Sequence, residues 1–304
     1  MKFDTLITEQ RNPESDGLDA LSTFEMLRVM NHQDHKVADA VGRALHEIAH
    51  AVDRIAAALE DGGRLFYIGA GTSGRLGVLD ASECPPTFSV PPDLVQGMMA
   101  GGMKALYSAT EASEDDPSLG ERDLIERQFT PRDVAVGIAA SGRTPYVLGA
   151  VRYARKLGAL TVGVSCQTHS ELSRTVEIGI EAVVGPEVVA GSTRLRAGTA
   201  TKMVLNMLST GTMVKLGHVY GNWMVNVQAK NEKLVDRAKR IIAEAAHVEA
   251  PVADRLFEES GRQVKVAIVM GLLGLDAEAA VAKLNAAHGR IREAVSESKG
   301  TTGK

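Results

Sequence analysis

Two hydrophobic patterns alternate through the middle of the chain. Continuous apolar runs, typical of parallel strands covered on both faces, predict five strands at residues 64–69, 95–100, 133–139, 159–165 and 178–184. Between these runs apolar residues recur at helical spacing, as at residues 144–157, where Thr144 is a candidate cap and Pro145 suits the first turn. The alternation predicts an α/β sandwich with right-handed crossovers between its strands.

Helical patterns also flank the predicted sheet. Residues 1–36 are polar and mixed, but over residues 37–60 apolar positions spaced three and four apart form one stripe that predicts a helix. After the sheet, the pattern predicts one long helix at residues 192–216. Short amphipathic helices are then expected at 230–246, 251–259, 264–273 and 277–287. We therefore expect a small helical domain at the C-terminus.

Composition narrows the class of protein. The chain has 304 residues, 44% of them hydrophobic, and a net charge of −4, which supplies no basic field for nucleic acid. No apolar run reaches the roughly 20 residues that a membrane helix needs, and the N-terminus has no apolar signal core. The only cysteines, Cys84 and Cys166, fit a reducing compartment. We therefore predict a cytoplasmic protein that binds neither nucleic acid nor membrane.

Two loops rich in glycine and hydroxyl groups each follow an apolar run. The first has the sequence GAGTSGR at residues 69–75, and the second has ASGRTP at residues 140–145. Glycine lets the backbone approach a ligand, and the helix that follows offers free N–H groups with a partial positive charge. The loops therefore predict a site for the phosphate of a sugar phosphate, formed by Gly71, Thr72, Ser73, Gly74, Ser141, Gly142, Arg143 and Thr144.

The first loop also matches the GxGxxG pattern of dinucleotide-binding proteins. That pattern needs an acidic residue at the end of the second strand, about 20 residues on, to hold a ribose. Glu83 and Asp93 lie at suitable distances, but neither stands at the end of a clear strand, and the second loop would have no role. A nicotinamide enzyme is therefore disfavoured, and so is a pair of glycine turns that bind nothing.

A second motif, HEIAH at residues 46–50, has the form of the zinc-binding signature HExxH. His46 and His50 point away from the apolar stripe of their predicted helix, and no convincing third ligand follows them. We interpret both histidines as solvent-exposed residues and predict no metal site.

Two carboxylates follow the first loop. Glu83 precedes Cys84-Pro85-Pro86, where the prolines are expected to stop a helix, and Glu114 lies in the acidic run at residues 111–117. By spacing alone, either glutamate suits acid–base catalysis or an ordinary helix end. Cys84 has no histidine placed beside it and is expected to be a small buried residue.

Four further motifs accompany the two loops: TEQRNP at residues 8–13, ASECPPTF at 81–88, EASED at 111–115 and GPEVVAGSTR at 185–194. Together these motifs resemble those of the N-acetylmuramic acid 6-phosphate etherases, a family of the sugar isomerase (SIS) superfamily. The resemblance runs from about Thr8 to the C-terminal helices, which is nearly the whole chain.

The resemblance implies a three-layer αβα SIS domain with a five-stranded parallel sheet, N-terminal helices and a small C-terminal helical domain. The corresponding parts are an N-terminal segment and helix at 1–54, a sugar-phosphate-binding SIS domain at 55–225, a helical domain at 226–296 and a disordered tail at 297–304. The family is usually dimeric, so a homodimer is expected, and the resemblance implies no metal or organic cofactor.

The activity that the resemblance implies is that of a carbon–oxygen lyase in cell-wall sugar recycling. These enzymes cleave the D-lactyl ether of N-acetylmuramic acid 6-phosphate to N-acetylglucosamine 6-phosphate and D-lactate. The family's catalytic glutamates correspond to Glu83, the acid for the departing lactate, and Glu114, the base at carbon 2. One must be ionised while the other is protonated. His218 is a further candidate, for opening the sugar ring.

Two other functions stay open at this point. Glucokinase regulators sense sugar phosphates without catalysis and resemble this chain around the first loop and Glu114, but they lack an equivalent of Glu83 and are far longer. An aldose–ketose phosphate isomerase would share proton removal beside the carbonyl and would release nothing. Lactate release therefore separates the etherase activity from both alternatives.

Overall fold

The chain forms two compact units. The computed structural model describes residues 6–108, 113–227 and 231–296, so the tail expected at 297–304 lies outside the described residues. The first unit comprises Met1–Glu83 and Pro92–Gly211, and the second comprises Cys84–Pro91 and Thr212–Lys304. Two helices, α3 (Gly71–Phe88) and α7 (Arg196–Lys215), each contribute residues to both units.

A five-stranded parallel sheet forms the centre of the first unit, as the apolar runs predict. Its strands are β1 (Leu65–Gly69), β2 (Val95–Met99), β3 (Val134–Ile138), β4 (Leu160–Ser165) and β5 (Ile178–Glu181). They pair in the order β2-β1-β3-β4-β5, and every neighbouring pair is parallel. The register pairs Gly69 with Ile138, so the carboxyl ends of β1 and β3 lie side by side.

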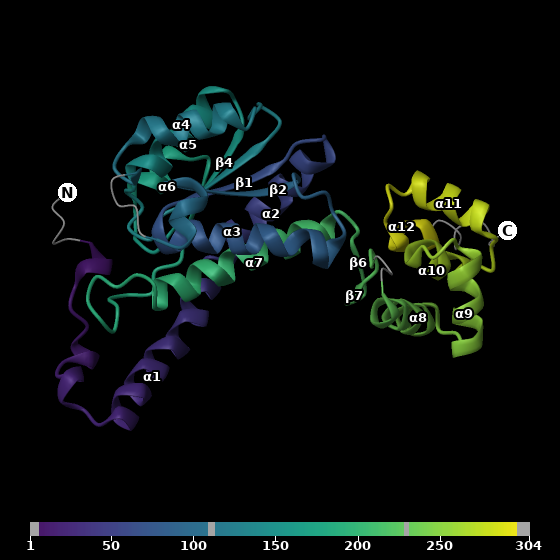
Figure 1. Cartoon of the computed structure of the whole chain (residues 1–304), viewed down its shortest axis with the longest axis horizontal. Helices are drawn as coiled ribbons and strands as arrows, with labels where there is room; N and C mark the ends of the chain where they lie inside the picture. Colours follow the sequence, from purple (N-terminus) through teal and green to yellow (C-terminus); the bar gives the residue numbers. More distant parts are fainter. Residues whose placement is uncertain (1–5, 109–112, 228–230, 297–304) are drawn as a thin grey trace. The chain divides into compact units, whose positions relative to one another are not determined.

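Helices cover both faces of this sheet (Figure 1). One face carries α4 (Pro117–Glu126), α5 (Pro145–Lys156) and α6 (Glu171–Thr175), and the other carries α2 (Leu45–Glu60), α3 and α7. Successive residues of β1 reach opposite faces. Phe66 packs in a buried core with residues of α4 and α5, whereas the Tyr67 hydroxyl donates to the Leu205 carbonyl of α7, at 3.4 Å. The three-layer αβα architecture is confirmed.

Two helices precede the sheet where the sequence pattern predicts one. The helix expected at 37–60 is divided into α1 (Thr23–Gly42) and α2, with a break next to Gly42, a residue that weakens helices. The start of α1 was not predicted, although it carries a capping box in which Ser22 and Glu25 each accept a hydrogen bond from the other's backbone N–H. Within the described residues, three short 3₁₀ turns come before it, η2 (Ile7–Glu9), η3 (Pro13–Ser15) and η4 (Leu18–Ala20).

The second unit is mainly helical. It contains a hairpin of β6 (Val219–Tyr220) and β7 (Trp223–Met224), followed by α8 (Glu232–Ala246), α9 (Ala250–Glu259), α10 (Val264–Leu273), α11 (Ala277–Ala286) and α12 (Ile291–Ser296). The pattern predicts α8 to α11 to within two residues but neither the hairpin nor α12, because elements of two to six residues show too little periodicity. Six of the ten residues of α10 are buried, and they join Phe257 in the core of this unit.

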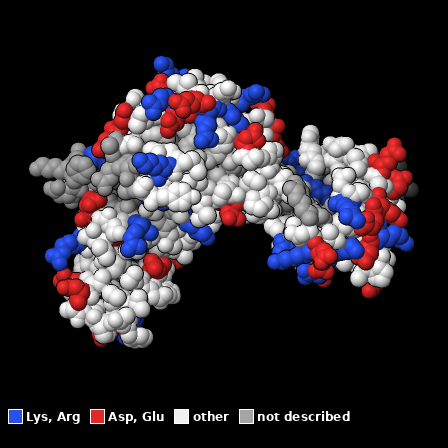
Figure 2. Space-filling view, in the orientation of Figure 1, with Lys and Arg blue, Asp and Glu red and all other residues white. Residues whose placement is uncertain are grey.

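Positive and negative side chains are mixed on the surface, as the small net charge of the sequence predicts. On the face shown in Figure 2, lysines and arginines lie among aspartates and glutamates, and the described residues of this face form no continuous basic surface. Among the described helices, none combines the length and the apolar character needed to cross a membrane.

An ion pair between a buried carboxylate and a partly exposed guanidinium secures the amino ends of two central strands. The Asp133 carboxylate, next to β3, accepts hydrogen bonds from the backbone N–H, Nε and Nη2 of Arg64, and also from the N–H and hydroxyl of Thr130. Burial alone would raise the pKa of Asp133, but these hydrogen bonds outweigh it and lower the pKa below its usual value. Asp133 therefore stabilises the fold in its ionised form.

We expect Asp133→Asn to lower the free energy of unfolding at pH 7 by about 2–4 kcal/mol, because it removes the charge of a buried carboxylate that accepts five hydrogen bonds. A lowered pKa means that this stabilisation is present above the unfolded pKa and is lost as pH falls through the folded pKa. The difference between variant and wild type should therefore shrink on acidification below about pH 4.

Urea unfolding at pH 7 and in acid measures both effects. The matched control is Asp16→Asn, because Asp16 pairs with Arg11 at 2.7 Å while both side chains are exposed, and little change is expected. Equal effects of the two substitutions would contradict the role assigned to burial.

Candidate functional site

The first loop turns directly from β1 into α3. The strand ends at Gly69 and the helix begins at Gly71, whose φ is +51°. A Cβ on Gly69 would lie 2.6 Å from the Gly74 amide nitrogen, and a Cβ on Gly74 would lie 2.6 Å from the Cβ of Met99 on β2. Only glycine fits at these points, and the tight turn brings the first turn of α3 to the carboxyl edge of the sheet.

The donors of this first turn are available to a ligand. The first hydrogen bond into α3 runs from the Gly74 N–H to the Ala70 carbonyl, at 3.1 Å. Within the described residues, the amides and hydroxyls of Thr72 and Ser73 have no hydrogen-bond partner, and both side chains are half-buried. Four such donors at a helix N-terminus suit an anion.

The second loop joins β3 to α5 at the same edge of the sheet. Gly142 has a φ of +67°, and a Cβ there would overlap the Cβ of Ser170. The Gly142 N–H donates to the Ala139 carbonyl at 2.8 Å and closes the turn. The hydroxyls of Ser141 and Thr144 have no partner in the part of the chain that the structure describes, so this loop also offers donors.

Thr144 is not the side-chain cap that the sequence predicts. It occupies the N-cap position of α5, but its side chain makes no capping hydrogen bond. Pro145 has no N–H, and the next amide, that of Tyr146, donates instead to the backbone carbonyl of Glu114 at 3.0 Å. Because a carbonyl from another loop caps the helix, the Thr144 hydroxyl stays open to a ligand.

The same hydrogen bond holds Glu114 between the two loops. Its carbonyl is bound to the start of α5, and its carboxylate oxygen Oε1 lies 3.4 Å from where a Cβ on Gly71 would stand. The neighbouring strands β1 and β3 send α3 and α5 to opposite faces, which makes this edge the switch point of the sheet. Open α/β sheets bind their ligands at such points. Glu114 is therefore a half-buried carboxylate next to both predicted phosphate loops.

Within one chain, Glu83 lies far from Glu114 and the two loops. The expected stop at Pro85-Pro86 is wrong, because α3 continues to Phe88 and Glu83 belongs to the helix. Glu83 follows Gly71 by twelve residues, which corresponds to about 18 Å along a helix. Between them, Val78 packs on Gly97 of β2, so α3 runs back across the sheet and carries an exposed Glu83 away from the loops. One chain does not bring the two glutamates together.

His218, the candidate for opening the ring, lies in the second unit. Its Nδ1 is hydrogen-bonded to the side-chain amide of Asn226, and its ring meets the Phe88 ring edge to face. Burial, helped by the positive charge of Lys265, lowers the pKa of His218 to about 4. The imidazole is therefore neutral near pH 7 and has one N–H to donate.

The remaining motifs behave as ordinary structure. Cys84 is buried, and His46 and His50 are exposed, as predicted. No group of three or more potential metal ligands occurs among the described residues. For a dinucleotide, the acidic residue would have to follow β2, but Ala100 stands there, and Asp93 precedes the strand.

Sequence reasoning missed the buried Glu187, whose carboxylate accepts hydrogen bonds from the N–H groups of Arg196 and Ala197 at the start of α7. The available signal was an acidic residue shortly before a long helix. Arg75, the last residue of the first loop, has a structural role that the sequence did not predict. Its guanidinium donates to the carbonyls of Ala105 and Leu106 and ties α3 to η5 (Gly102–Leu106).

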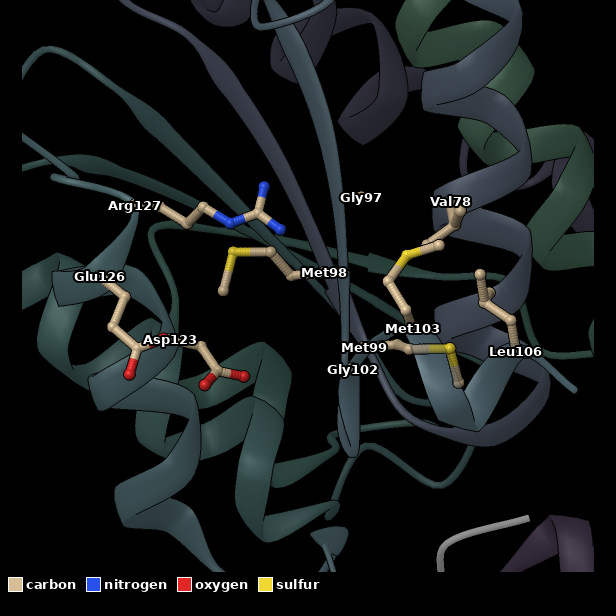
Figure 3. Close-up of a pocket in the computed structure, with 10 residues that line it drawn as sticks. All are labelled: Val78, Gly97, Met98, Met99, Gly102, Met103, Leu106, Asp123, Glu126 and Arg127. Carbon is tan, nitrogen blue, oxygen red and sulfur yellow. The ribbon is translucent and has the colours of Figure 1, made fainter. Parts of the chain in front are cut away.

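A cavity of about 280 Å³ lies at the outer edge of β2 (Figure 3). Met98 lies on one side of this strand with the charged residues at the end of α4, and Met99 lies on the other side with Val78. The lining includes none of the predicted phosphate-binding residues and neither candidate glutamate. This cavity is therefore separate from the candidate site.

The order of the strands, with hydroxyl-rich loops at the switch point, defines an open doubly wound α/β protein, and a family comparison assigns its sheet to the SIS class. Residues 47–155 match the family model described as the glucokinase regulatory protein N-terminal SIS domain. A phosphoheptose isomerase structure from Francisella tularensis is 16% identical, with a TM-score of 0.49, over 64% of this chain and 100% of that chain.

Relatives that match nearly the full length of the chain identify its family within the SIS class. The N-acetylmuramic acid 6-phosphate etherase of Serratia proteamaculans is 55% identical over 97% of this chain and 99% of its own length. The protein of the same name from Pectobacterium atrosepticum is 54% identical over 97% of each chain. The chain belongs to the N-acetylmuramic acid 6-phosphate etherase family.

We expect Gly74→Ala to lower the free energy of unfolding by about 1–3 kcal/mol, because its Cβ would overlap Met99 and push α3 from the sheet. The affinity for inorganic phosphate should fall as the donors of Thr72 and Ser73 move. Urea unfolding and calorimetric titration measure the two effects. Gly42→Ala is the control, because nothing lies within 4 Å of its Cβ. Unchanged phosphate affinity in a folded Gly74→Ala protein would contradict the assignment of the loop.

Proposed function

We propose that this protein cleaves the D-lactyl ether of N-acetylmuramic acid 6-phosphate and releases N-acetylglucosamine 6-phosphate and D-lactate. The observation that carries the proposal is Glu114, a carboxylate held between two loops whose hydroxyl groups lack partners within the described residues. Relatives named N-acetylmuramic acid 6-phosphate etherase match nearly the whole chain and support the proposal. Two free, buried cysteines fit the cytoplasmic location that we also propose.

The two loops bind the phosphate. Thr72 and Ser73 donate from the first turn of α3, and Ser141 and Thr144 donate from the second loop. The glycines keep the backbone close to the ligand. Fixing the phosphate end of the open-chain sugar orients its reacting carbons, so that a positioned carboxylate can act on them.

The reaction proceeds by elimination and then hydration. Ring opening exposes an aldehyde, which acidifies the proton on carbon 2, and the Glu114 carboxylate takes that proton. The bond between carbon 3 and the ether oxygen breaks, and Glu83 gives its proton to that oxygen, so lactate leaves. Water then adds to the double bond, returning a hydrogen to carbon 2 and a hydroxyl to carbon 3.

We also propose that the protein is a homodimer whose sites each combine Glu114 of one chain with the partner subunit's Glu83. The support is geometric, because Glu83 lies about 18 Å along α3 from the first loop of its own chain. That distance is greater than one carboxylate can bridge to reach a sugar anchored at the loop. A second copy supplies the missing acid without any change in the fold of the chain.

The alternatives differ in their products. A non-catalytic sensor is an alternative because residues 47–155 match the glucokinase regulatory protein domain. The etherase relatives match nearly the whole chain and therefore favour the enzyme. An isomerase would move a carbonyl and release no acid. The products therefore separate the three functions.

The test is incubation with N-acetylmuramic acid 6-phosphate in deuterium oxide, followed by mass spectrometry of acid and sugar. We expect D-lactate, together with N-acetylglucosamine 6-phosphate that carries deuterium at carbon 2. Binding of the sugar phosphate without lactate would indicate a sensor, and a rearranged sugar without lactate would indicate an isomerase.

We expect Glu83→Ala to lower kcat by about 10²–10⁴-fold, because the departing lactate then lacks its proton donor. The matched control is Glu47→Ala, which removes another exposed helical glutamate and should leave kcat unchanged. Lactate release is measured on variants with unchanged circular dichroism. Full turnover by the Glu83→Ala protein would refute its role as the acid.

A mixture of Glu83→Ala and Glu114→Ala chains tests the shared site. After subunit exchange, half of the dimers are mixed and each has one intact site, so about a quarter of wild-type activity should return. Each variant alone should stay inactive. If exchange is verified by mass spectrometry and no activity returns, the two glutamates do not come from different subunits.

A further inference from the structure

A buried glutamate holds the first turn of α7. Glu187 lies in the loop between β5 and α7 and is 1% exposed. Its Oε2 accepts a hydrogen bond from the Arg196 N–H at 3.0 Å, and its Oε1 accepts one from the Ala197 N–H at 2.9 Å. The carboxylate thus binds two of the N–H groups that a helix leaves unpaired at its start, where the positive end of the helix dipole also favours it.

This turn of α7 lies against the first loop. Gly198 follows Ala197, and a Cβ on Gly198 would lie 3.6 Å from the methyl carbon of Thr72 and 3.5 Å from the Thr193 carbonyl oxygen. Because 3.6 Å is an ordinary van der Waals distance for a Cβ that Gly198 does not have, the buried start of α7 lies next to Thr72 with no side chain of its own between them. A shift of this turn would therefore change the space in which Thr72 is held, and the amide and hydroxyl of Thr72 have no partner within the described residues.

The chain around Glu187 is fixed on both sides. The carbonyl of Pro186 accepts hydrogen bonds from Arg196 Nη1 at 2.8 Å and from Asn12 Nδ2 at 3.4 Å. The carbonyl of Val188 accepts one from the Ser15 hydroxyl at 2.8 Å. Burial raises the pKa of Glu187, while the two N–H groups and Arg196 oppose the rise. A buried carboxylate with both oxygens bound and its neighbours anchored has little freedom to move.

We propose that Glu187 is a positioning residue of the phosphate site, which fixes the start of α7 so that Thr72 keeps its place in the first loop. Glu187 acts through Gly198 and Thr72 and does not touch the substrate. The inference rests on the proposed function in one respect, that the first loop binds the phosphate of the substrate. It adds a determinant of affinity that lies behind the loop.

Glu187→Gln tests the role with little change in size. One oxygen becomes an NH₂ group facing an N–H of α7, so one charge-assisted hydrogen bond is lost. We expect the KM for the sugar phosphate and the Kd for inorganic phosphate to rise about tenfold. The value of kcat should stay within about twofold, because neither catalytic glutamate moves. Glu177→Gln is the control, because Glu177 is exposed and pairs with Arg54 at 2.6 Å, and it should change neither constant.

Glu187→Ala removes both hydrogen bonds and should raise the Kd for phosphate further. Circular dichroism shows whether it folds, and if it does not, the Gln variant decides. Unchanged KM and Kd in the folded Gln variant would overturn the proposal, as would a fall in kcat at constant KM. A wild-type protein that binds no phosphate would overturn it too. The calorimetric titration needs no turnover, so absence of lactate release would count against the proposed function alone.

Discussion

No side chain fits between the end of β1 and its neighbours, and this steric limit determines where the site forms. A Cβ on Gly69 or on Gly74 would meet atoms at 2.6 Å, so the chain must turn into α3 with bare backbone. The turn leaves the amides of Thr72 and Ser73 at the carboxyl edge of the sheet, next to the loop that follows β3. Two loops distant in sequence become one surface because their strands are hydrogen-bonded neighbours.

The two candidate glutamates are held in different ways. Glu114 is fixed by its backbone between the loops, whereas Glu83 projects from a helix that leads away from them. A reaction that needs a base and an acid on adjacent carbons cannot combine a base beside the first loop with an acid about 18 Å along α3 from that loop. This separation links the proposed chemistry to the proposed assembly, since a second chain is the simplest source of the missing acid.

Much of the fold follows from local pattern, and the exceptions have physical causes. Buried parallel strands are apolar on both faces, so all five strands were predicted to within about three residues. The start of α1 was not predicted because its apolar residues form no core-facing stripe, and Phe24 and Leu27 are exposed in the structure. Pro85 and Pro86 led to a wrong prediction because they stand near the end of α3, where each removes one backbone hydrogen bond and the helix still continues to Phe88.

The candidate site was predictable in its residue types and less so in its geometry. The glycines and hydroxyls of both loops are local signals, and the structure brings these loops to one edge. Their partners come from distant segments, and no spacing rule reports that the Glu114 carbonyl replaces Thr144 as the cap of α5 or that Glu187 binds the start of α7. The distance between Glu83 and Glu114 likewise depends on the direction of α3, which sequence separation does not reveal.

The hydrogen bond from the Tyr146 amide to Glu114 uses a backbone oxygen, so any residue at position 114 can make it. That hydrogen bond is therefore available whatever side chain stands at position 114. In evolutionary terms, a protein with this architecture can lose the proposed base in one substitution and keep the backbone contact that joins its loop to α5. The proposed chemistry and this backbone contact are therefore separable at position 114, and a change from enzyme to receptor, or back, need not pass through a misfolded ancestor.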